Sequence, residues 1–324
     1  MKAIAQDRYG SPDVLELREV DAPVVADDGV LVRVRAAAVN ARDWHLMRGD
    51  PYLARLGLGL SGPRTKIRGT DFAGLVEAVG RNVKRFRPGD EVFGEADAAF
   101  AEFVCAPDGA VGPKPAGLSF EQAAALPLAG NTALMGLRDL GEVRPGQEVL
   151  INGASGGVGT FAVQIAKAFG AEVTGVCSTR NTDLVRSLGA DHLVDYTRED
   201  FTRLGRRYDL VFDLVGNHSL TGFRRALKPT GTLVLSGGGV FEGGSAVGPM
   251  GLLLKGQVMS RFARHRLFVL TATPSKENLA ALGELAASGK LVPVIDRTYP
   301  LDEAPEAIRY LEGEHARSKV VITV

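Results

Sequence analysis

A glycine-rich loop between a strand and a helix constrains this chain more than any other feature. Residues 148–152 are typical of a buried strand, and residues 153–159 read Gly-Ala-Ser-Gly-Gly-Val-Gly before an apolar run at helical spacing. Ala154 stands where the strict fingerprint has its first glycine, and Gly156 and Gly159 follow in register. Glycines let the backbone approach a pyrophosphate closely, and a helix N-terminus offers free N–H groups. The loop therefore predicts a dinucleotide site, and the competing interpretation is a simple tight turn.

Strands and helices alternate on both sides of this loop. Beyond residues 148–152, we predict strands over residues 173–177, 193–196, 210–215, 232–236 and 267–271, and helices over residues 161–169, 183–188 and 219–227. Such alternation predicts an α/β domain built on a parallel sheet with helices on both faces.

The first part of the chain has a different texture. Residues 30–35 alternate apolar and charged side chains with period two, and short β-type runs follow at 75–79, 91–93 and 103–106. This spacing predicts a small, bent antiparallel domain. The tail adds predicted helices at 277–287 and 305–312 and a strand at 319–324, which we assign to the first domain because a terminal strand needs a sheet partner. The predicted organisation is residues 1–122 and 274–324 around a cofactor domain of residues 123–273.

Charge and cysteine content exclude several classes of function. The 324 residues include 38 Lys plus Arg and 38 Asp plus Glu, so the formal net charge of zero argues against a general nucleic-acid binder. The two cysteines, Cys105 and Cys177, provide no disulfide framework and no four-thiolate zinc site. The first residues meet charge too early for a signal peptide, and no apolar run is long enough for a membrane span. We expect a cytoplasmic protein with a small-molecule ligand.

The end of the second predicted strand of the α/β domain indicates which nicotinamide cofactor binds. An NAD site usually places an acid there to hold the ribose 2′-hydroxyl. This chain has Ser178 and Arg180 instead, with no acid until Asp183. A guanidinium suits the 2′-phosphate of NADPH because it offers paired donors to phosphate oxygens. The alternative is that Arg180 only caps a solvated turn.

Several motifs, in this order and spacing, resemble the medium-chain dehydrogenase/reductase superfamily over nearly the whole chain. The similarity is to its quinone oxidoreductase branch, close to the reticulon-4-interacting type of NADPH oxidoreductase and its bacterial relatives. The motifs are Ala38-Val39-Asn40, Gly69-Thr70-Asp71-Phe72-Ala73-Gly74, Pro88-Gly89-Asp90-Glu91-Val92-Phe93-Gly94, Ala123-Ala124-Ala125-Leu126-Pro127, the glycine loop, Leu188-Gly189-Ala190-Asp191, and His315-Ala316-Arg317-Ser318-Lys319-Val320.

The resemblance implies a doubly wound Rossmann domain inside a GroES-like, mainly β substrate domain formed by both ends of the chain. It also implies a set of cofactor-binding residues in the cleft between them. The residues expected at the pyrophosphate are Ser155, Gly156, Gly157 and Val158, and those expected at the 2′-phosphate are Ser178, Arg180 and Tyr196. Asn40 and Thr132 are expected beside the nicotinamide, and Lys319, Phe268 and Val269 are expected along the cleft. In this family the strand that carries Phe268 commonly pairs across a dimer, so the resemblance implies a homodimer.

The expected chemistry depends on a departure from the zinc enzymes of the same superfamily. Their catalytic ligands correspond to Asn40, Thr70 and Leu128 here, and the five histidines show no paired metal spacing, so we predict no catalytic zinc. Without a Lewis acid, the substrate must carry the charge that hydride addition creates. A quinone or a conjugated enone does so, as a hydroquinone anion or an enolate. We therefore predict an NADPH-dependent quinone or enone oxidoreductase.

Asn40, Thr132 and Tyr52 are the candidate donors near the acceptor oxygen. Tyr52 follows a turn, and residues 53–66 are expected to shape the substrate pocket. An equal alternative for Tyr52 is a rim aromatic that packs against its neighbours. Two other functions stay open at this point: an enoyl-thioester reductase with the same fold and cofactor, and a non-enzymatic NADPH-binding protein.

Overall fold

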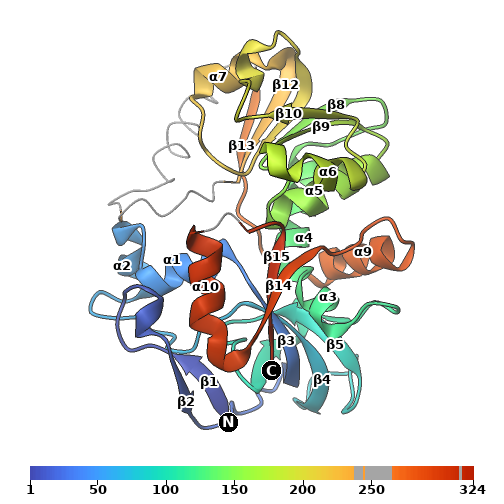
Figure 1. Ribbon diagram of the computed structural model, residues 1–324. Coiled ribbons are helices and arrows are strands. Elements are labelled where there is room, and N and C mark those ends of the chain that lie inside the picture. The colour runs from blue at the N-terminus through green and yellow to red at the C-terminus, as the bar shows by residue number, and fades with distance from the viewer. Residues whose placement is uncertain (237–243, 245–264, 314–315) are drawn as a thin grey trace.

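The computed structural model describes residues 1–236, 244, 265–313 and 316–324. A parallel sheet lies at the top of Figure 1, a mainly antiparallel sheet lies at the bottom, and both chain termini are in the lower part. The chain runs from the lower part to the upper part and returns. This return brings residues from the two ends of the sequence to the same lobe.

Six parallel strands of the described chain form the upper sheet, in the order β10-β9-β8-β11-β12-β13. They are β8 (Glu148–Asn152), β9 (Glu172–Cys177), β10 (His192–Asp195), β11 (Tyr208–Asp213), β12 (Leu227–Leu235) and β13 (Arg266–Val269). Each predicted strand of the α/β domain corresponds to one of them. The order reverses between β8 and β11, which is the switch point where doubly wound sheets bind ligands, and the predicted Rossmann fold is confirmed.

Three helices of this lobe are predicted by the sequence. They are α5 (Gly157–Ala168), α6 (Thr182–Ser187) and α7 (Leu220–Arg225). The sequence predicts no helix over residues 120–140, yet these residues form α3 (Phe120–Ala124), which packs on the lower sheet, α4 (Pro127–Leu134), which packs on α5, and the π-helical turn η4 (Met135–Leu140). Nearly every residue of α4 is buried, so the polar face that marks an amphipathic helix is missing.

The lower sheet of the described chain follows the order β14-β15-β3-β4-β5-β7, and β6 pairs with β3. Its strands are β3 (Gly29–Val39), β4 (Asp71–Val79), β5 (Glu91–Glu95), β6 (Phe103–Pro107), β7 (Val111–Pro113), β14 (Ile295–Pro300) and β15 (Lys319–Thr323), and a separate pair is formed by β1 (Lys2–Ala5) and β2 (Glu16–Glu19). β15 runs antiparallel to β3, with Val320 opposite Val39. The tail therefore finds its sheet partner at the start of the chain, and the limits at residues 122 and 274 stay a prediction.

The remaining helices of the described chain connect these strands. They are α1 (Ala41–Arg48), α2 (Arg55–Leu58), α9 (Lys276–Ala287) and α10 (Ala304–Gly313), and single 3₁₀ turns include η2 (Tyr52–Ala54), η3 (Asp108–Ala110) and η5 (Thr179–Asn181). Asn40 stands at the N-cap of α1, and the Asp43 carboxylate accepts from the Asn40 backbone amide at 2.7 Å. This bond helps to fix the direction in which the chain leaves β3, directly beside the candidate site.

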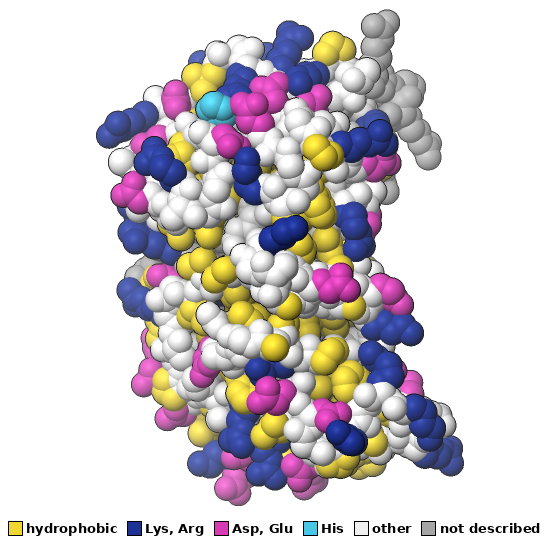
Figure 2. All heavy atoms as spheres, turned by 90° about the vertical axis from the view of Figure 1, so that its right-hand side faces the viewer, with side chains coloured by type: hydrophobic (Ala, Val, Ile, Leu, Met, Phe, Trp, Pro, Cys, Tyr) yellow, Lys and Arg dark blue, Asp and Glu magenta, His cyan; other side chains and the backbone are white. Residues whose placement is uncertain are grey.

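Both lobes have apolar cores, and their surfaces carry mixed charge. Valine, leucine, isoleucine, alanine and phenylalanine side chains fill the space on both faces of the parallel sheet and within the antiparallel sheet. On the face shown in Figure 2, basic and acidic side chains are interspersed from top to bottom, and apolar side chains gather across the middle. Among the described residues, no helix has the length and hydropathy that a membrane crossing requires.

Candidate active site

The glycine loop connects β8 to α5 and has the close backbone packing that its sequence predicts. Gly153 has a φ of +89°, and a Cβ at Gly159 would lie 2.1 Å from the Gly153 carbonyl oxygen. A Cβ at Gly157 would lie 3.3 Å from Cδ of Lys319. Side chains at these positions would fill the space next to the N-terminus of α5, so the loop has the cradle form that a pyrophosphate requires.

The start of β15 holds this loop in place. The Ser318 amide donates to the Ser155 carbonyl oxygen at 2.8 Å, and the Ser318 and Thr160 hydroxyls lie 2.9 Å apart. From the other side, Nδ2 of Asn181 donates to the Ser155 hydroxyl at 3.0 Å. The loop is thus bonded both to the return segment of the chain and to the turn that follows β9. Ser155 and Gly156 lie in the loop between β8 and α5, and Val158 is half-buried in the first turn of α5.

The three residues predicted at a 2′-phosphate lie together at the ends of two neighbouring strands. Ser178 follows β9, Arg180 is in η5, and Tyr196 follows β10, with its amide donating to the Cys177 carbonyl oxygen at 3.1 Å. Ser178 is half-buried, while Arg180 and Tyr196 are exposed. A hydroxyl, a guanidinium and a phenol at one open edge suit a solvent-facing phosphate.

Sequence reasoning missed an acid at this edge. Asp195 ends β10 and accepts hydrogen bonds from the hydroxyls of Thr179 at 2.5 Å and Thr197 at 2.7 Å. These bonds hold the pKa of the Asp195 carboxyl below its ordinary value. The acid belongs to the third strand of the parallel sheet in chain order, so the residues at the end of the second strand do not reveal it. Both of its oxygens accept hydrogen bonds from neighbouring hydroxyls.

A buried lysine lies at the centre of the site. Nζ of Lys319, at the start of β15, lies 2.5 Å from Oδ1 of Asn40, 3.2 Å from the Val39 carbonyl oxygen and 3.6 Å from Oδ2 of Asp71. The Lys319 side chain is 2% exposed and that of Asp71 is fully buried. Burial lowers the pKa of the Lys319 ammonium and raises the pKa of the Asp71 carboxyl, and each charge opposes the shift of the other. Together they form a closed ion pair.

Asn40 has committed its polar atoms to this cluster. Its Nδ2 donates to Asp71 at 3.0 Å and to the Ala38 carbonyl oxygen at 3.2 Å, and its Oδ1 accepts from Lys319. Both hydrogens of the amide are therefore used within the protein. Asn40 is placed to orient the site, whereas its predicted role as a donor to an acceptor oxygen would need one of these bonds to open.

The three positions that hold metal in zinc relatives are joined by hydrogen bonds here. The Leu128 amide donates to Asp71 at 3.0 Å, the Thr70 hydroxyl donates to Asp43 at 3.0 Å, and Asn40 contacts both acids. Burial raises the pKa of Asp43 to about 6. Within the described ranges, no group of three or more His, Cys, Asp or Glu side chains is arranged to hold a metal ion. An amide, a hydroxyl and an aliphatic side chain are a poor donor set for zinc.

Glu95 is a further buried acid, and the sequence alone did not single it out. It stands opposite Asp71 on the adjacent strand, and its Oε1 lies 3.5 Å from Nδ2 of Asn131, while Oε2 has no hydrogen-bond partner in the described part of the chain. Burial, with the charge of Asp71 as the second cause, raises the pKa of Glu95 to about 8. This shift favours the protonated form of Glu95. A carboxyl that ends the apolar run Val92-Phe93-Gly94 was the available signal.

Thr132 and Tyr52 lie in different surroundings. The Thr132 hydroxyl donates its hydrogen to the Leu128 carbonyl oxygen at 2.7 Å. Its lone pairs remain, so toward a ligand it can accept a hydrogen bond more readily than donate one. Tyr52 is 49% exposed, and the Arg55 guanidinium lies 4.7 Å from its ring centroid. A Cβ at Gly244 would lie 2.4 Å from the Tyr52 hydroxyl. The structure places Tyr52 at the rim against Gly244, outside the Lys319 cluster, and its catalytic role stays a prediction.

Phe268 and Val269 lie on the edge strand of the parallel sheet. β13 pairs with β12 on one side, and both side chains are half-buried. On its other side, β13 has no strand partner within the described residues. This position is compatible with the pairing across a dimer that the resemblance implies, and contact of the two residues with cofactor stays a prediction.

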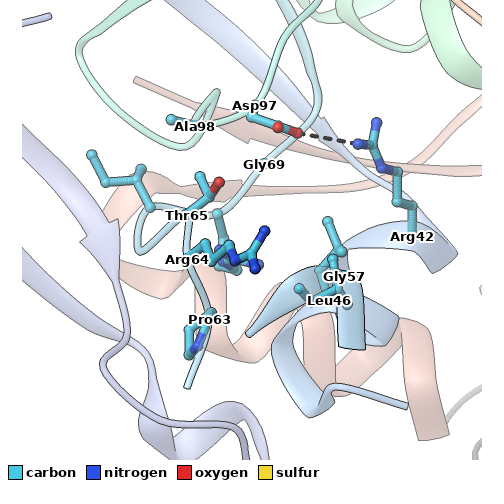
Figure 3. Close-up of a pocket in the computed structure, with 12 residues that line it drawn as sticks. Arg42, Leu46, Gly57, Pro63, Arg64, Thr65, Gly69, Asp97 and Ala98 are labelled. Atoms are coloured by element: carbon cyan, nitrogen blue, oxygen red, sulfur yellow. Dashed lines mark hydrogen bonds and ion pairs between the residues drawn. The ribbon is translucent and has the colours of Figure 1, made fainter. Parts of the chain in front are cut away.

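A pocket of about 170 Å³ opens beside α1. As Figure 3 shows, α1 contributes Arg42 and Leu46, the segment after η2 contributes Gly57, Pro63, Arg64 and Thr65, and Asp97 and Ala98 close the far side. Part of the segment that was expected to shape the substrate pocket, residues 53–66, therefore does line a pocket. Gly69, also on its wall, immediately precedes Thr70 of the Asp43 network.

Known proteins resemble the chain along its whole length. Family models match residues 26–116, as an alcohol dehydrogenase GroES-like domain, and residues 188–322, as a zinc-binding dehydrogenase. The chain is 37% identical to 2-methylene-furan-3-one reductase of Solanum lycopersicum, over 99% of this chain and 79% of that protein. It is 35% identical to the mitochondrial NAD(P)H oxidoreductase RTN4IP1 of Mus musculus, over 100% and 89%. The solved quinone oxidoreductase from Coxiella burnetii superposes with a TM-score of 0.84 at 34% identity, covering 100% of this chain and 99% of that one.

Proposed function

Because the chain belongs to the quinone oxidoreductase branch of the medium-chain dehydrogenase/reductase superfamily, we propose that it is an NADPH-dependent reductase of quinones or conjugated enones that needs no catalytic metal. One observation carries this proposal. The positions of Asn40, Thr70 and Leu128 are tied by hydrogen bonds to Asp43, Asp71 and Lys319, so a closed polar network stands where zinc relatives place their ligands.

The cofactor would be held along the cleft by residues from both lobes. The loop of Ser155, Gly156, Gly157 and Val158 offers close backbone approach for the pyrophosphate, and the N-terminus of α5 offers partial positive charge. Ser178, Arg180 and Tyr196 support a preference for NADPH, because Arg180 can donate paired hydrogen bonds to a 2′-phosphate. When bound, NADPH supplies hydride to the acceptor.

The protein's own part in the reaction is positioning. Lys319 packs its stem against Gly157 and its ammonium against Asn40, so one side chain sets the spacing between the phosphate loop and the nicotinamide end of the cleft. The Thr132 hydroxyl, whose hydrogen is engaged, can accept from an amide group of the cofactor. Holding two reactants in contact supplies a large share of the rate for a reaction of this kind.

The class of acceptor follows from the polar groups at the site. Asn40 has both amide hydrogens committed, and the described residues of the Lys319 cluster offer no free cation to stabilise a localised alkoxide. A simple ketone needs such stabilisation. A quinone delocalises the added charge as a phenolate with a pKa near about 10, and an enone delocalises it as an enolate. These acceptors fit a site whose polar groups are already paired.

A panel of acceptors tests the proposal. Purified protein with NADPH should reduce a benzoquinone and an enone, and should leave cyclohexanone unchanged. Faster reduction of crotonyl-CoA than of either would favour an enoyl-thioester reductase. NADPH binding with no turnover over the whole panel would favour a non-enzymatic binding protein, and zinc-dependent reduction of cyclohexanone would contradict the proposal.

Two further parts of the proposal concern the assembly and its location. We propose a homodimer that pairs along the outer edge of β13, and a cytoplasmic location. One chain has a mass of 34.3 kDa, and light scattering of the purified protein should give twice that mass. Introduction of a proline within β13 should shift the protein to monomer, because proline cannot donate to a strand partner.

A further inference from the structure

The pocket beside α1 is lined by an excess of positive charge. Its walls include three arginines, Arg42, Arg64 and Arg68, and one acid, Asp97. Figure 3 shows the ion pair between Asp97 and Arg42, whose atoms lie 3.2 Å apart. Asp97 therefore offsets one guanidinium, and two positive charges remain on the walls of a pocket of about 170 Å³.

Arg68 is the unusual member of this set. It is 4% exposed, and its Nε has no hydrogen-bond partner in the described part of the chain. The nearby acids, Asp43 and Asp97, favour its charged form only through longer-range attraction. A buried guanidinium N–H without a hydrogen-bond partner is costly, and such groups are normally satisfied by a carboxylate or another acceptor. The unsatisfied donor in a small cavity points to a ligand that accepts hydrogen bonds and carries negative charge.

The position of the pocket relates it to the reaction site. Arg42 is two residues from Asn40, and Gly69 and Arg68 directly precede Thr70, which bonds to Asp43. The charge of Arg42 also acts on Glu95, where it opposes the rise in pKa. A molecule in the pocket would therefore lie against the polar network of the active site. The volume is below the roughly 300–1,000 Å³ of sites for drug-sized ligands, so it suits one end of a small molecule.

We propose that this pocket binds a carboxylate carried by the hydride acceptor, and that Arg68 and Arg64 make the chain selective for acidic enones or quinones over neutral ones. The inference rests on the proposed function and adds the substrate class. Arg68 provides the buried donors, Arg64 provides charge from the exposed wall, and Arg42 stays paired with Asp97.

A matched pair of acceptors tests this selectivity: trans-4-oxopent-2-enoate and its methyl ester. In both, hydride from NADPH forms a C–H bond at the carbon β to the ketone, the electron pair of the C=C bond passes to the enolate, and the α carbon takes a proton from water. The ester is intrinsically the more electrophilic of the two, so chemistry alone favours it. We expect kcat/KM for the acid to exceed that for the ester by about tenfold or more, as charge-assisted hydrogen bonds predict.

Variants separate the arginines from general effects. Arg68→Gln should lose most of the preference for the acid and keep its rate with the ester, and Arg68→Lys should retain part of the preference. Arg64→Gln changes an exposed residue, so it provides an alternative test if Arg68→Gln does not fold. It should reduce the preference for the acid severalfold. The control is Arg87→Gln, whose side chain is 87% exposed and lies on a surface turn, and which should leave the ratio unchanged.

The outcomes distinguish the two proposals. Turnover of the ester with no preference for the acid would overturn the carboxylate site and leave the proposed function intact. If neither compound is reduced, the enone part of the proposed function fails, and calorimetry with the saturated acid 4-oxopentanoate then decides the site independently of turnover. Binding to the wild type that Arg68→Gln weakens at least about tenfold would support it. No binding, or equal binding to both proteins, would contradict it.

Discussion

The side-chain nitrogen of Lys319 lies 2.5 Å from the side-chain oxygen of Asn40, which precedes it by 279 residues. Lys319 starts the last strand, and Asn40 follows the third strand and stands at the N-cap of α1. The stem of the same lysine lies under the phosphate loop at Gly157. One contact therefore joins the two ends of the chain and the cofactor lobe, and it explains why the return of the C-terminal strand matters for the site.

Removal of this lysine should destabilise the protein strongly. Lys319→Met leaves the Asp71 carboxylate buried without its cation, which typically costs about 3–5 kcal/mol. The free energy of unfolding in urea measures the loss. Addition of Asp71→Asn should recover part of it, because the uncompensated charge is then gone. Equal stabilities of wild type and Lys319→Met would show that the pair contributes nothing.

The phosphate loop gives a test that depends on space. In Gly157→Val, the new side chain meets Lys319 and the path of the pyrophosphate, so NADPH binding should be lost while the fold remains. Fluorescence titration with NADPH measures this. Gly109→Val is the matched control, because no atom lies within 4 Å of a Cβ at that position. Unchanged affinity in a folded Gly157→Val protein would mean that the loop is only a turn.

The parts of the fold that sequence predicted well are those with a clear period. The buried strand of residues 148–152 and the alternating run within β3 both appear where expected, because burial on two faces or on one face leaves a distinct pattern. β14 was missed because it is polar and only half-buried at the edge of its sheet. α4 was missed for the opposite reason, since it is buried on all sides.

The site shows the same division. The glycine loop was found because its function needs a local sequence motif. Glu95, Asp43 and Arg68 take part through contacts between segments far apart in the chain, and no spacing in the sequence announces such contacts. The commitment of both Asn40 hydrogens to Asp71 and Ala38 is also a product of three-dimensional packing. It could not be read from an asparagine in a motif.

Glu95 should make stability depend on pH. Its pKa in the folded protein is about 8, against an ordinary value of 4.5, so the folded state retains a proton that the unfolded chain has lost between these values. Stability then falls as the pH rises through this range. Glu95→Gln cannot ionise at this position. The difference in free energy of unfolding between this variant and the wild type should therefore shift in favour of the variant by roughly 1–4 kcal/mol from pH 5 to pH 8.

Urea unfolding at both pH values measures this gain. Glu77→Gln, which alters a half-exposed acid of the neighbouring strand β4, should show no comparable gain. A constant difference between Glu95→Gln and the wild type across the range would contradict the assignment of a raised pKa to Glu95.

Arg180 should determine the choice of cofactor. Arg180→Ala removes a charge-assisted contact to the 2′-phosphate worth roughly 1.5–3 kcal/mol, so the affinity for NADPH should fall by about one to two decades while that for NADH barely changes. Tyr196→Phe removes a single hydroxyl and should cost less. Both dissociation constants can be measured by fluorescence at low and high salt. Equal weakening for the two cofactors would point to the pyrophosphate or to misfolding instead.

The central claim is that hydride passes from NADPH to a conjugated acceptor without a metal. It is tested most directly by treating the protein with a chelator, removing the chelator and bound metal by dialysis, and supplying NADPH deuterated at the transferred position of C4 together with an enone. We predict undiminished turnover and one deuterium at the β carbon of the product, located by NMR. Turnover that disappears with the metal and returns with added zinc, or a product whose β carbon carries no deuterium, would contradict the account.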